Sequence, residues 1–258
     1  MQEFISYKNI QIAFTAEGKG ETIVLLHGFL ESSAIWRAIT PILVENYQVI
    51  SVDLLGHGAS QRLGYIHTME EMAQTVHQVL LHLGVNNASF VGHSMGGYVA
   101  LAFAELFPKK TEKLILLNST SEADSAERKE NRDRAKRLIK QNKDAFVSMA
   151  IKNLFAEETK EKFPEEIKQL LLEAKKIPVE NIIATVEGLK NRKDRTEVLQ
   201  NFKGKKMILA GKSDPVVPFM AIEMLAEQTN TELLSFSNGH MSYLENTEEL
   251  INTLNNIF

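Results

Sequence analysis

Short, continuously apolar runs recur along the chain, and most are separated by stretches of helical periodicity. Ile23-Val24-Leu25-Leu26 is one such run, and residues 114–117 form another. Strands covered on both faces of a sheet are typical of this pattern, which favours a mostly parallel sheet flanked by helices. The expected strands are 4–7, 10–14, 22–26, 47–52, 88–91, 113–117, 207–210 and 232–236, the first two forming a hairpin. The pattern therefore predicts an α/β fold.

Helix boundaries are marked by local signals. Thr68-Met69-Glu70-Glu71 fits a capping box, in which the threonine and the second glutamate satisfy free backbone N–H groups. Apolar residues then recur every three or four positions until Gly84, which predicts a helix over 69–83. Leu250, Ile251, Leu254 and Ile257 indicate a final amphipathic helix.

The alternation of strands and helices stops between residues 119 and 200, where only helical patterns occur. Helices are expected around 145–155, 164–174 and 179–190. The charged stretch 122–144, which also has helical spacing, is expected to be a solvated face. The sequence therefore predicts a core made of residues 1–118 and 201–258, with an all-helical cap over 119–200.

Composition restricts the classes of function. The 258 residues are 44% hydrophobic, carry a net charge of −4 and show no basic patch, so no nucleic-acid partner is expected. The chain has no cysteine, which excludes disulfides and thiol chemistry. No apolar run approaches the ~20 residues that span a bilayer. The N-terminus does not resemble a secretory signal, so a cytoplasmic location is expected.

The motif Gly92-His93-Ser94-Met95-Gly96 lies between the apolar run 88–91 and a helical run over 98–107. A sharp turn from strand to helix strains the residue at the turn and exposes its side chain, and the glycines make room for the crossing. This context predicts that Ser94 is a nucleophile. A serine that merely caps a helix is the alternative, but it leaves the flanking glycines unexplained.

A nucleophilic serine needs a base, and His240 is the best candidate of seven histidines. It follows the last expected strand, and the loops at the carboxyl edge of a parallel sheet are where functional groups collect. His93 is adjacent to Ser94, but neighbouring side chains on a tight turn point apart. His67, His77 and His82 lie on or beside the expected helix 69–83 and are interpreted as surface or packing residues.

The third group should be an acid on a loop after a strand, between the serine and the base in chain order. Asp214 follows the strand 207–210, and Pro215 and Pro218 stiffen its loop. Asp124 is the fallback because it follows the preceding strand. Asp53 is interpreted as part of a structural turn.

Acyl transfer also requires donors for the developing oxyanion. The backbone N–H groups of Met95 and Phe29 are the candidates, since Gly28 lets the second loop curl inward; His27 is expected to brace that loop. Besides these two residues, the expected pocket walls are Leu30, Phe146, Met149, Phe155, Val217 and Met241. The chain contains no zinc, calcium, dinucleotide or Walker motif, so no metal or cofactor is assigned.

The chain resembles the α/β-hydrolase superfamily through five motifs in the family's order. These are His27-Gly28-Phe29, residues 53–60, residues 92–97, residues 211–218 and Gly239-His240. The resemblance covers nearly the whole chain. It implies an eight-stranded sheet, a helical cap inserted after the sixth strand and a triad of Ser94, Asp214 and His240.

The expected activity is hydrolysis of a small or medium carboxylic ester, because dehalogenases and epoxide hydrolases of this superfamily use an aspartate nucleophile. Residues 26–29 and 53–58 also resemble the menaquinone-pathway synthase that eliminates pyruvate, but Tyr98 stands where that family has a carboxylate-binding arginine. C–C bond hydrolysis and a small-molecule receptor that keeps the triad are further alternatives. The sequence leaves the substrate and the oligomeric state open.

Overall fold

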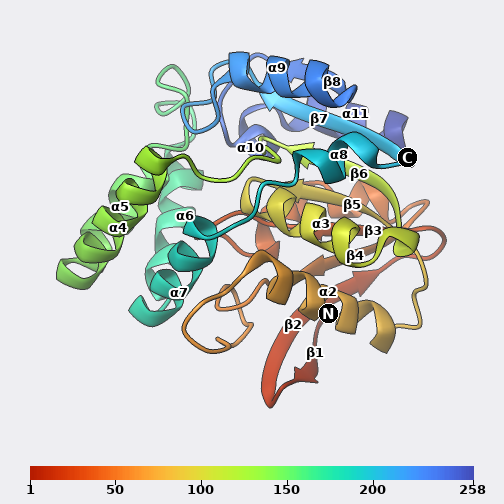
Figure 1. Ribbon diagram of the computed structural model, residues 1–258, viewed down its shortest axis with the longest axis horizontal. Coiled ribbons are helices and arrows are strands. Elements are labelled where there is room, and N and C mark those ends of the chain that lie inside the picture. Colours follow the sequence, from red (N-terminus) through yellow and green to blue (C-terminus); the bar gives the residue numbers. More distant parts are fainter.

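An eight-stranded sheet runs through the centre of the protein (Figure 1), and the computed structural model describes all 258 residues. The strand order is β1-β2-β4-β3-β5-β6-β7-β8. β2 is antiparallel to both of its neighbours, and all other pairs are parallel, which confirms the expected fold class. The strands are β1 Gln2–Tyr7, β2 Ile10–Glu17, β3 Thr22–Leu26, β4 Gln48–Val52, β5 Ala88–His93, β6 Thr111–Leu117, β7 Lys205–Gly211 and β8 Glu232–Phe236.

Helices cover both faces of the sheet. One face packs against α2 (Met69–His82), α3 (Met95–Leu106), α8 (Thr196–Asn201) and α9 (Phe219–Thr229). The other packs against η1 (Ser33–Ala38), α1 (Thr40–Leu43), α10 (Ser242–Glu245) and α11 (Thr247–Ile257), while η2 (Pro108–Lys110) links α3 to β6.

The continuous apolar run of β3 follows from this burial on two sides. Val24 and Leu26 belong to the apolar cluster on one face of the sheet, and Ile23 and Leu25 belong to the cluster on the other. Alternate side chains of a strand point to opposite faces, so each position must be apolar when both faces are covered.

The local signals in the sequence act at the expected positions. The Glu71 backbone N–H donates to Thr68 Oγ1 over 3.1 Å and caps α2, which is the threonine half of the expected capping box. The Glu71 carboxylate accepts instead from Tyr7 and Lys8 of the first hairpin. Lys8 and Asn9 have φ values of 46° and 67°, and they form the tight turn between β1 and β2. Positive φ at both central residues suits the twist of a two-residue hairpin.

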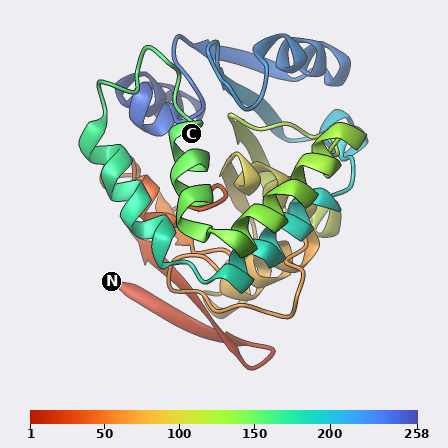
Figure 2. The ribbon, with the colours of Figure 1, turned by 90° about the vertical axis from the view of Figure 1, so that its left-hand side faces the viewer.

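Four helices between β6 and β7 stand to one side of the sheet (Figures 1 and 2), and we call them the cap. They are α4 (Ala126–Gln141), α5 (Lys143–Lys152), α6 (Pro164–Lys176) and α7 (Val179–Lys190). They share an apolar cluster that also contains Leu30 from the loop after β3. α8 lies within the range expected for the cap, but it packs against α3 and α9. None of the helices is long and apolar enough to cross a bilayer.

Candidate active site

Ser94 occupies the turn between β5 and α3 with φ 50° and ψ −114°, a conformation that non-glycine residues rarely adopt. Among residues 91–100 it alone is not buried. Its backbone is fixed because its N–H donates to the Leu117 carbonyl over 2.9 Å and its carbonyl accepts from Ser119 Oγ over 2.7 Å. The strained turn therefore presents the hydroxyl at the carboxyl edge of the sheet.

Close backbone contacts explain the two glycines that flank this turn. A Cβ atom at Gly92 would lie 2.4 Å from the Gly96 backbone, and a Cβ at Gly96 would lie 2.2 Å from the carbonyl oxygen of Leu26. Real Cβ atoms do not approach other atoms so closely. Strand β5, helix α3 and strand β3 thus meet at a point that admits no side chain.

Asp214 and His240 meet at the same edge, on the loops after β7 and β8. Asp214 Oδ2 lies 2.7 Å from His240 Nδ1, and both side chains are buried. Asp214 Oδ1 accepts from the N–H groups of Val216 at 2.7 Å and Val217 at 2.9 Å. Burial opposes the charge of this carboxyl, but His240 and the two N–H groups outweigh it and hold the pKa of Asp214 below its usual value.

Asn118 joins the two loops. Nothing in the sequence indicates this role, apart from the position of Asn118 directly after β6. Its side-chain amide donates to Asp214 Oδ2 over 3.1 Å and to the Gly239 carbonyl over 3.1 Å. Asn118 is fully buried and has φ 48°. A short side chain that tolerates this conformation and offers two donors suits the position.

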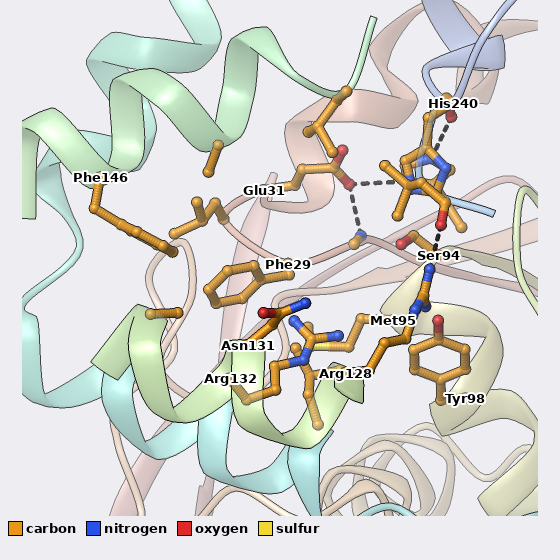
Figure 3. A pocket seen from close by; sticks show the side chains of 18 residues that line it. Phe29, Glu31, Ser94, Met95, Tyr98, Arg128, Asn131, Arg132, Phe146 and His240 are labelled. Carbon is orange, nitrogen blue, oxygen red and sulfur yellow. Dashed lines mark hydrogen bonds and ion pairs between the residues drawn. The ribbon is translucent and has the colours of Figure 1, made fainter. Parts of the chain in front are cut away.

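A cavity of about 330 Å³ lies between this edge of the sheet and the cap, and Ser94 and His240 both line it (Figure 3). Phe29 and Met95 line it as well. The backbone N–H groups of these two residues have no acceptor within the protein. Two free donors beside a partly exposed serine are what an oxyanion-binding site requires.

Only Leu30 and Phe146 of the six further wall residues line this cavity. Val217 and Met241 were expected to be walls of the cavity, and this is wrong. Both are buried in the core clusters, while their neighbours Val216 and His240 line the cavity. Adjacent side chains in a loop point in different directions, so a wall residue and a core residue can be neighbours in the sequence.

Met149 and Phe155 were also expected to line the cavity, and neither does. Phe146 and Ala150 face the cavity from α5, whereas Met149 lies on another face of that helix and is 48% exposed. Phe155 is buried in the core cluster. The rotation of a helix about its axis relative to the sheet decides such positions, and periodicity alone does not specify it.

A buried charged network lies behind Ser94. Glu31 accepts from the Gly28 N–H at 2.6 Å and the Tyr243 hydroxyl at 3.1 Å, and its carboxylate lies 3.0 Å from His93 Nδ1. The other ring nitrogen of His93 lies 2.9 Å from the carbonyl oxygen of His240. Both ring nitrogens of His93 are thus engaged, and His93 connects Glu31 to the backbone of His240.

The ionisation of Glu31 and His93 is coupled. Burial opposes the positive charge of His93, but the Glu31 carboxylate outweighs it and raises the pKa of His93. Burial likewise opposes the negative charge of Glu31, and His93 outweighs it and lowers the pKa of Glu31. Both pKa shifts favour the charged forms of the pair, and a protonated His93 can donate from both ring nitrogens.

Three other polar candidates do not line the cavity. The Asp53 carboxylate accepts from the backbone N–H groups of Ser33 and Ala59, so it shapes a turn. His27 Nε2 accepts from the Leu54 N–H over 2.9 Å and braces its loop. Asp124 pairs with two arginines. No cluster of histidine and carboxylate side chains is arranged to hold a metal ion.

Most of the charged stretch 122–144 is exposed, as expected, but one part of it is not a solvated face. Arg128, Asn131 and Arg132 of α4 line the cavity. The sequence shows that the helix is polar, but the side that faces inward depends on how the cap packs over the sheet. A polar face of α4 therefore closes the cavity above Ser94.

A family model described as "alpha/beta hydrolase fold" matches residues 21–247. A thermophilic esterase from Thermogutta terrifontis, in a malate-bound structure, has a TM-score of 0.92 and 29% identity over 99% of this chain and 97% of that one. An esterase from Exiguobacterium antarcticum has a TM-score of 0.90 over 100% and 99% of the two chains, and at 23% identity it supports the fold alone.

Curated sequences match over shorter regions. The pimeloyl-[acyl-carrier protein] methyl ester esterase of Photobacterium profundum is 34% identical over 109 residues, 42% of this chain and 41% of that protein. The uncharacterized hydrolase YugF of Bacillus subtilis is 39% identical over 101 residues, 39% of this chain and 37% of that protein. The chain spans about a third to two fifths of the length of the curated relatives it matches.

Proposed function

The chain belongs to the α/β-hydrolase family, and from this membership we propose that it is a serine hydrolase of small to medium carboxylic esters. The observation that carries the proposal is the 2.7 Å contact between Asp214 and His240, with His240 and Ser94 lining one cavity. A base held by a carboxylate beside an exposed serine is the arrangement that activates a hydroxyl for acyl transfer.

In the proposed reaction, Ser94 Oγ attacks the ester carbonyl while His240 Nε2 takes the hydroxyl proton. Asp214 accepts the Nδ1–H of His240 and stabilises the imidazolium. The N–H groups of Phe29 and Met95 donate to the oxyanion. His240 then gives its proton to the departing alcohol, which leaves an acyl group on Ser94. A water molecule, deprotonated by His240, attacks that acyl group and regenerates the serine.

Two features support ester hydrolysis within this family. The esterase from Thermogutta terrifontis reported above is 29% identical over nearly the whole chain. The cavity of about 330 Å³ has a mostly apolar lining, which suits a short acyl chain. Besides water, the proposed ester hydrolysis uses no group other than the side chains and N–H donors named above.

The test compares turnover of p-nitrophenyl acetate and butyrate by wild type, Ser94→Ala and Asp214→Asn. We expect each variant to lose on the order of 10⁴-fold in kcat, because the nucleophile or the correct imidazole tautomer is lost. Ser148→Ala is the matched control, since Ser148 lies on α5 and does not line the cavity. Undiminished turnover by Ser94→Ala would show that another group attacks the ester.

A further inference from the structure

Helix α4 directs three polar side chains into an otherwise mostly apolar cavity. Arg128, Asn131 and Arg132 stand at positions i, i+3 and i+4, which share one face of a helix. Figure 3 shows all three projecting from the helix towards Phe29, Ser94 and Met95. The remaining wall is dominated by Leu30, Ala135, Phe146, Ala150, Leu154 and Leu189. This polar face is a separate feature from the reacting groups.

Positive charge exceeds negative charge at this side of the cavity. Asp124 lies 3.0 Å from Arg132 and 2.5 Å from Arg192, so one carboxylate serves two arginines. Arg192 also lies over the ring of Tyr98, 4.3 Å from its centroid. Glu31, the acidic residue that lines the cavity, is paired with His93. No carboxylate of the chain is left to neutralise a further cation here.

Arg128 is that further cation. It has no carboxylate within ion-pair distance, and its guanidinium donates only to the carbonyl oxygen of Val216. A carbonyl accepts a hydrogen bond but does not cancel the charge, and a guanidinium has five N–H donors. Arg128 is also partly buried, so its charge is partly removed from water without a counter-ion. A carboxylate in the cavity would supply the missing charge and use the free donors.

We propose that Arg128 forms a carboxylate subsite and that the preferred substrate is an ester whose acyl chain ends in a carboxylate. The proposal rests on the proposed function for the reacting ester. The alcohol must leave towards His240, which protonates it. In the view of Figure 3, the labelled His240 lies above Ser94 and Arg128 lies below it, and we assign the acyl chain to the side of Arg128. Asn131 offers a side-chain amide on the same helix face.

The experiment compares monoethyl glutarate with ethyl pentanoate, whose acyl chains have the same length and end in a carboxylate and a methyl group. We expect wild type to prefer monoethyl glutarate in kcat/KM. Arg128→Gln should lower kcat/KM for monoethyl glutarate about 10- to 100-fold, the range for a charge-assisted hydrogen bond. Ethyl pentanoate should change less than about threefold, because its methyl group makes no such bond.

Arg128→Lys should keep part of the preference, since it keeps the charge but not the planar fork. Arg137→Gln is the matched control, because it removes one positive charge from an exposed position of the same helix. We expect Arg137→Gln to leave the preference unchanged. Equal losses for both esters in Arg128→Gln would overturn the subsite. An Arg128-dependent preference for 4-acetoxybutanoate over butyl acetate would place the carboxylate on the alcohol and overturn the acyl assignment.

Binding of glutarate, measured by calorimetry, separates this proposal from the proposed function. We expect Arg128→Gln to weaken glutarate binding at least tenfold, whether or not Ser94 acts as the nucleophile. Binding of equal strength to wild type and to Arg128→Gln would overturn the subsite. If Ser94→Ala hydrolyses both ethyl esters as wild type does, the proposed function fails while the binding result still decides the role of Arg128.

Discussion

Glu31 is a buried carboxylate whose charge depends on His93, the residue before the exposed serine. Its three partners, the Gly28 N–H, the Tyr243 hydroxyl and the His93 ring, come from three separate parts of the chain. Removing one member of such a buried pair leaves the other charge without compensation. The network therefore holds the loop of Phe29, the turn of Ser94 and the backbone of His240 together.

We expect Glu31→Gln to lower the free energy of unfolding by about 3 kcal/mol near pH 6. In wild type, the raised pKa of His93 contributes stability that is lost as pH rises above about 6.5 and through the folded-state pKa. The lowered pKa of Glu31 contributes stability that is lost as pH falls below about 4.5. The difference between wild type and variant should therefore be greatest between these limits.

Urea unfolding from pH 4 to pH 9 measures this difference. Glu165→Gln is a suitable control, because Glu165 is an exposed residue of α6 that contacts only Lys168. A difference between wild type and Glu31→Gln that stays constant over the whole range would contradict the charged pair.

At the level of residues, chain order and loop position are enough to predict that Asp214 and His240 meet. Both follow strands of one parallel sheet, and the ends of such strands gather at one edge. Glu31 could not be assigned in this way, because nothing near it in the sequence names His93 or Tyr243 as its partners. Arg128 was hidden for a related reason: a polar helix does not reveal which of its charges face inward.

At the level of elements, the crossing of β5, α3 and β3 leaves no room for a side chain. We expect Gly96→Ala to lower the thermal midpoint by several degrees or to prevent folding, because its Cβ would meet the Leu26 carbonyl at 2.2 Å. The φ value of Gly96 is not positive, so the effect is purely steric.

Gly64→Ala provides the comparison, measured by calorimetry on both variants. Gly64 has φ 66° but no atom near its would-be Cβ, so only backbone strain of about 1 kcal/mol is expected there. A smaller loss of stability in Gly96→Ala than in Gly64→Ala would contradict the close crossing.

Strands and long helices could be predicted because their patterns are strong and local. The helix expected over 69–83 is α2, Met69–His82, and the pattern over 179–190 is α7, Val179–Lys190. The packing of these elements against one another was harder to predict from the sequence. α8 has only six residues, too few for a periodic pattern, and its packing against α3 and α9 depends on tertiary structure.

At the level of the whole molecule, buried neutral histidines should make the fold sensitive to acid. Burial lowers the pKa of His57 to about 3 and that of His67 to about 4. The unfolded chain binds protons at these positions below about pH 6.5, whereas the folded protein does not, so stability falls as pH decreases. Each histidine should contribute about 1.4 kcal/mol per pH unit over this range.

His57→Gln tests this expectation by urea unfolding between pH 5 and pH 6. The slope of the unfolding free energy against pH should be smaller than in wild type by about 1.4 kcal/mol per pH unit. Identical slopes would mean that His57 carries a proton in the folded protein.

The order of the motifs was enough to predict the sheet and the insertion of helices after β6, because topology follows from the sequence of elements. The shape of the cavity could not be predicted from the sequence, because it depends on how α4 and α5 pack over the sheet. The corrected position of Met149 follows from that packing.

Leu30 gives the cap a further role. It follows Phe29 directly, has φ 65° and is buried in the apolar cluster of the cap. A displaced or shortened cap would uncover Leu30 and release the peptide that carries the Phe29 N–H. Exchanging caps between related proteins in order to alter selectivity would therefore also displace the proposed oxyanion donor, unless the new cap contains an apolar cluster that buries residue 30.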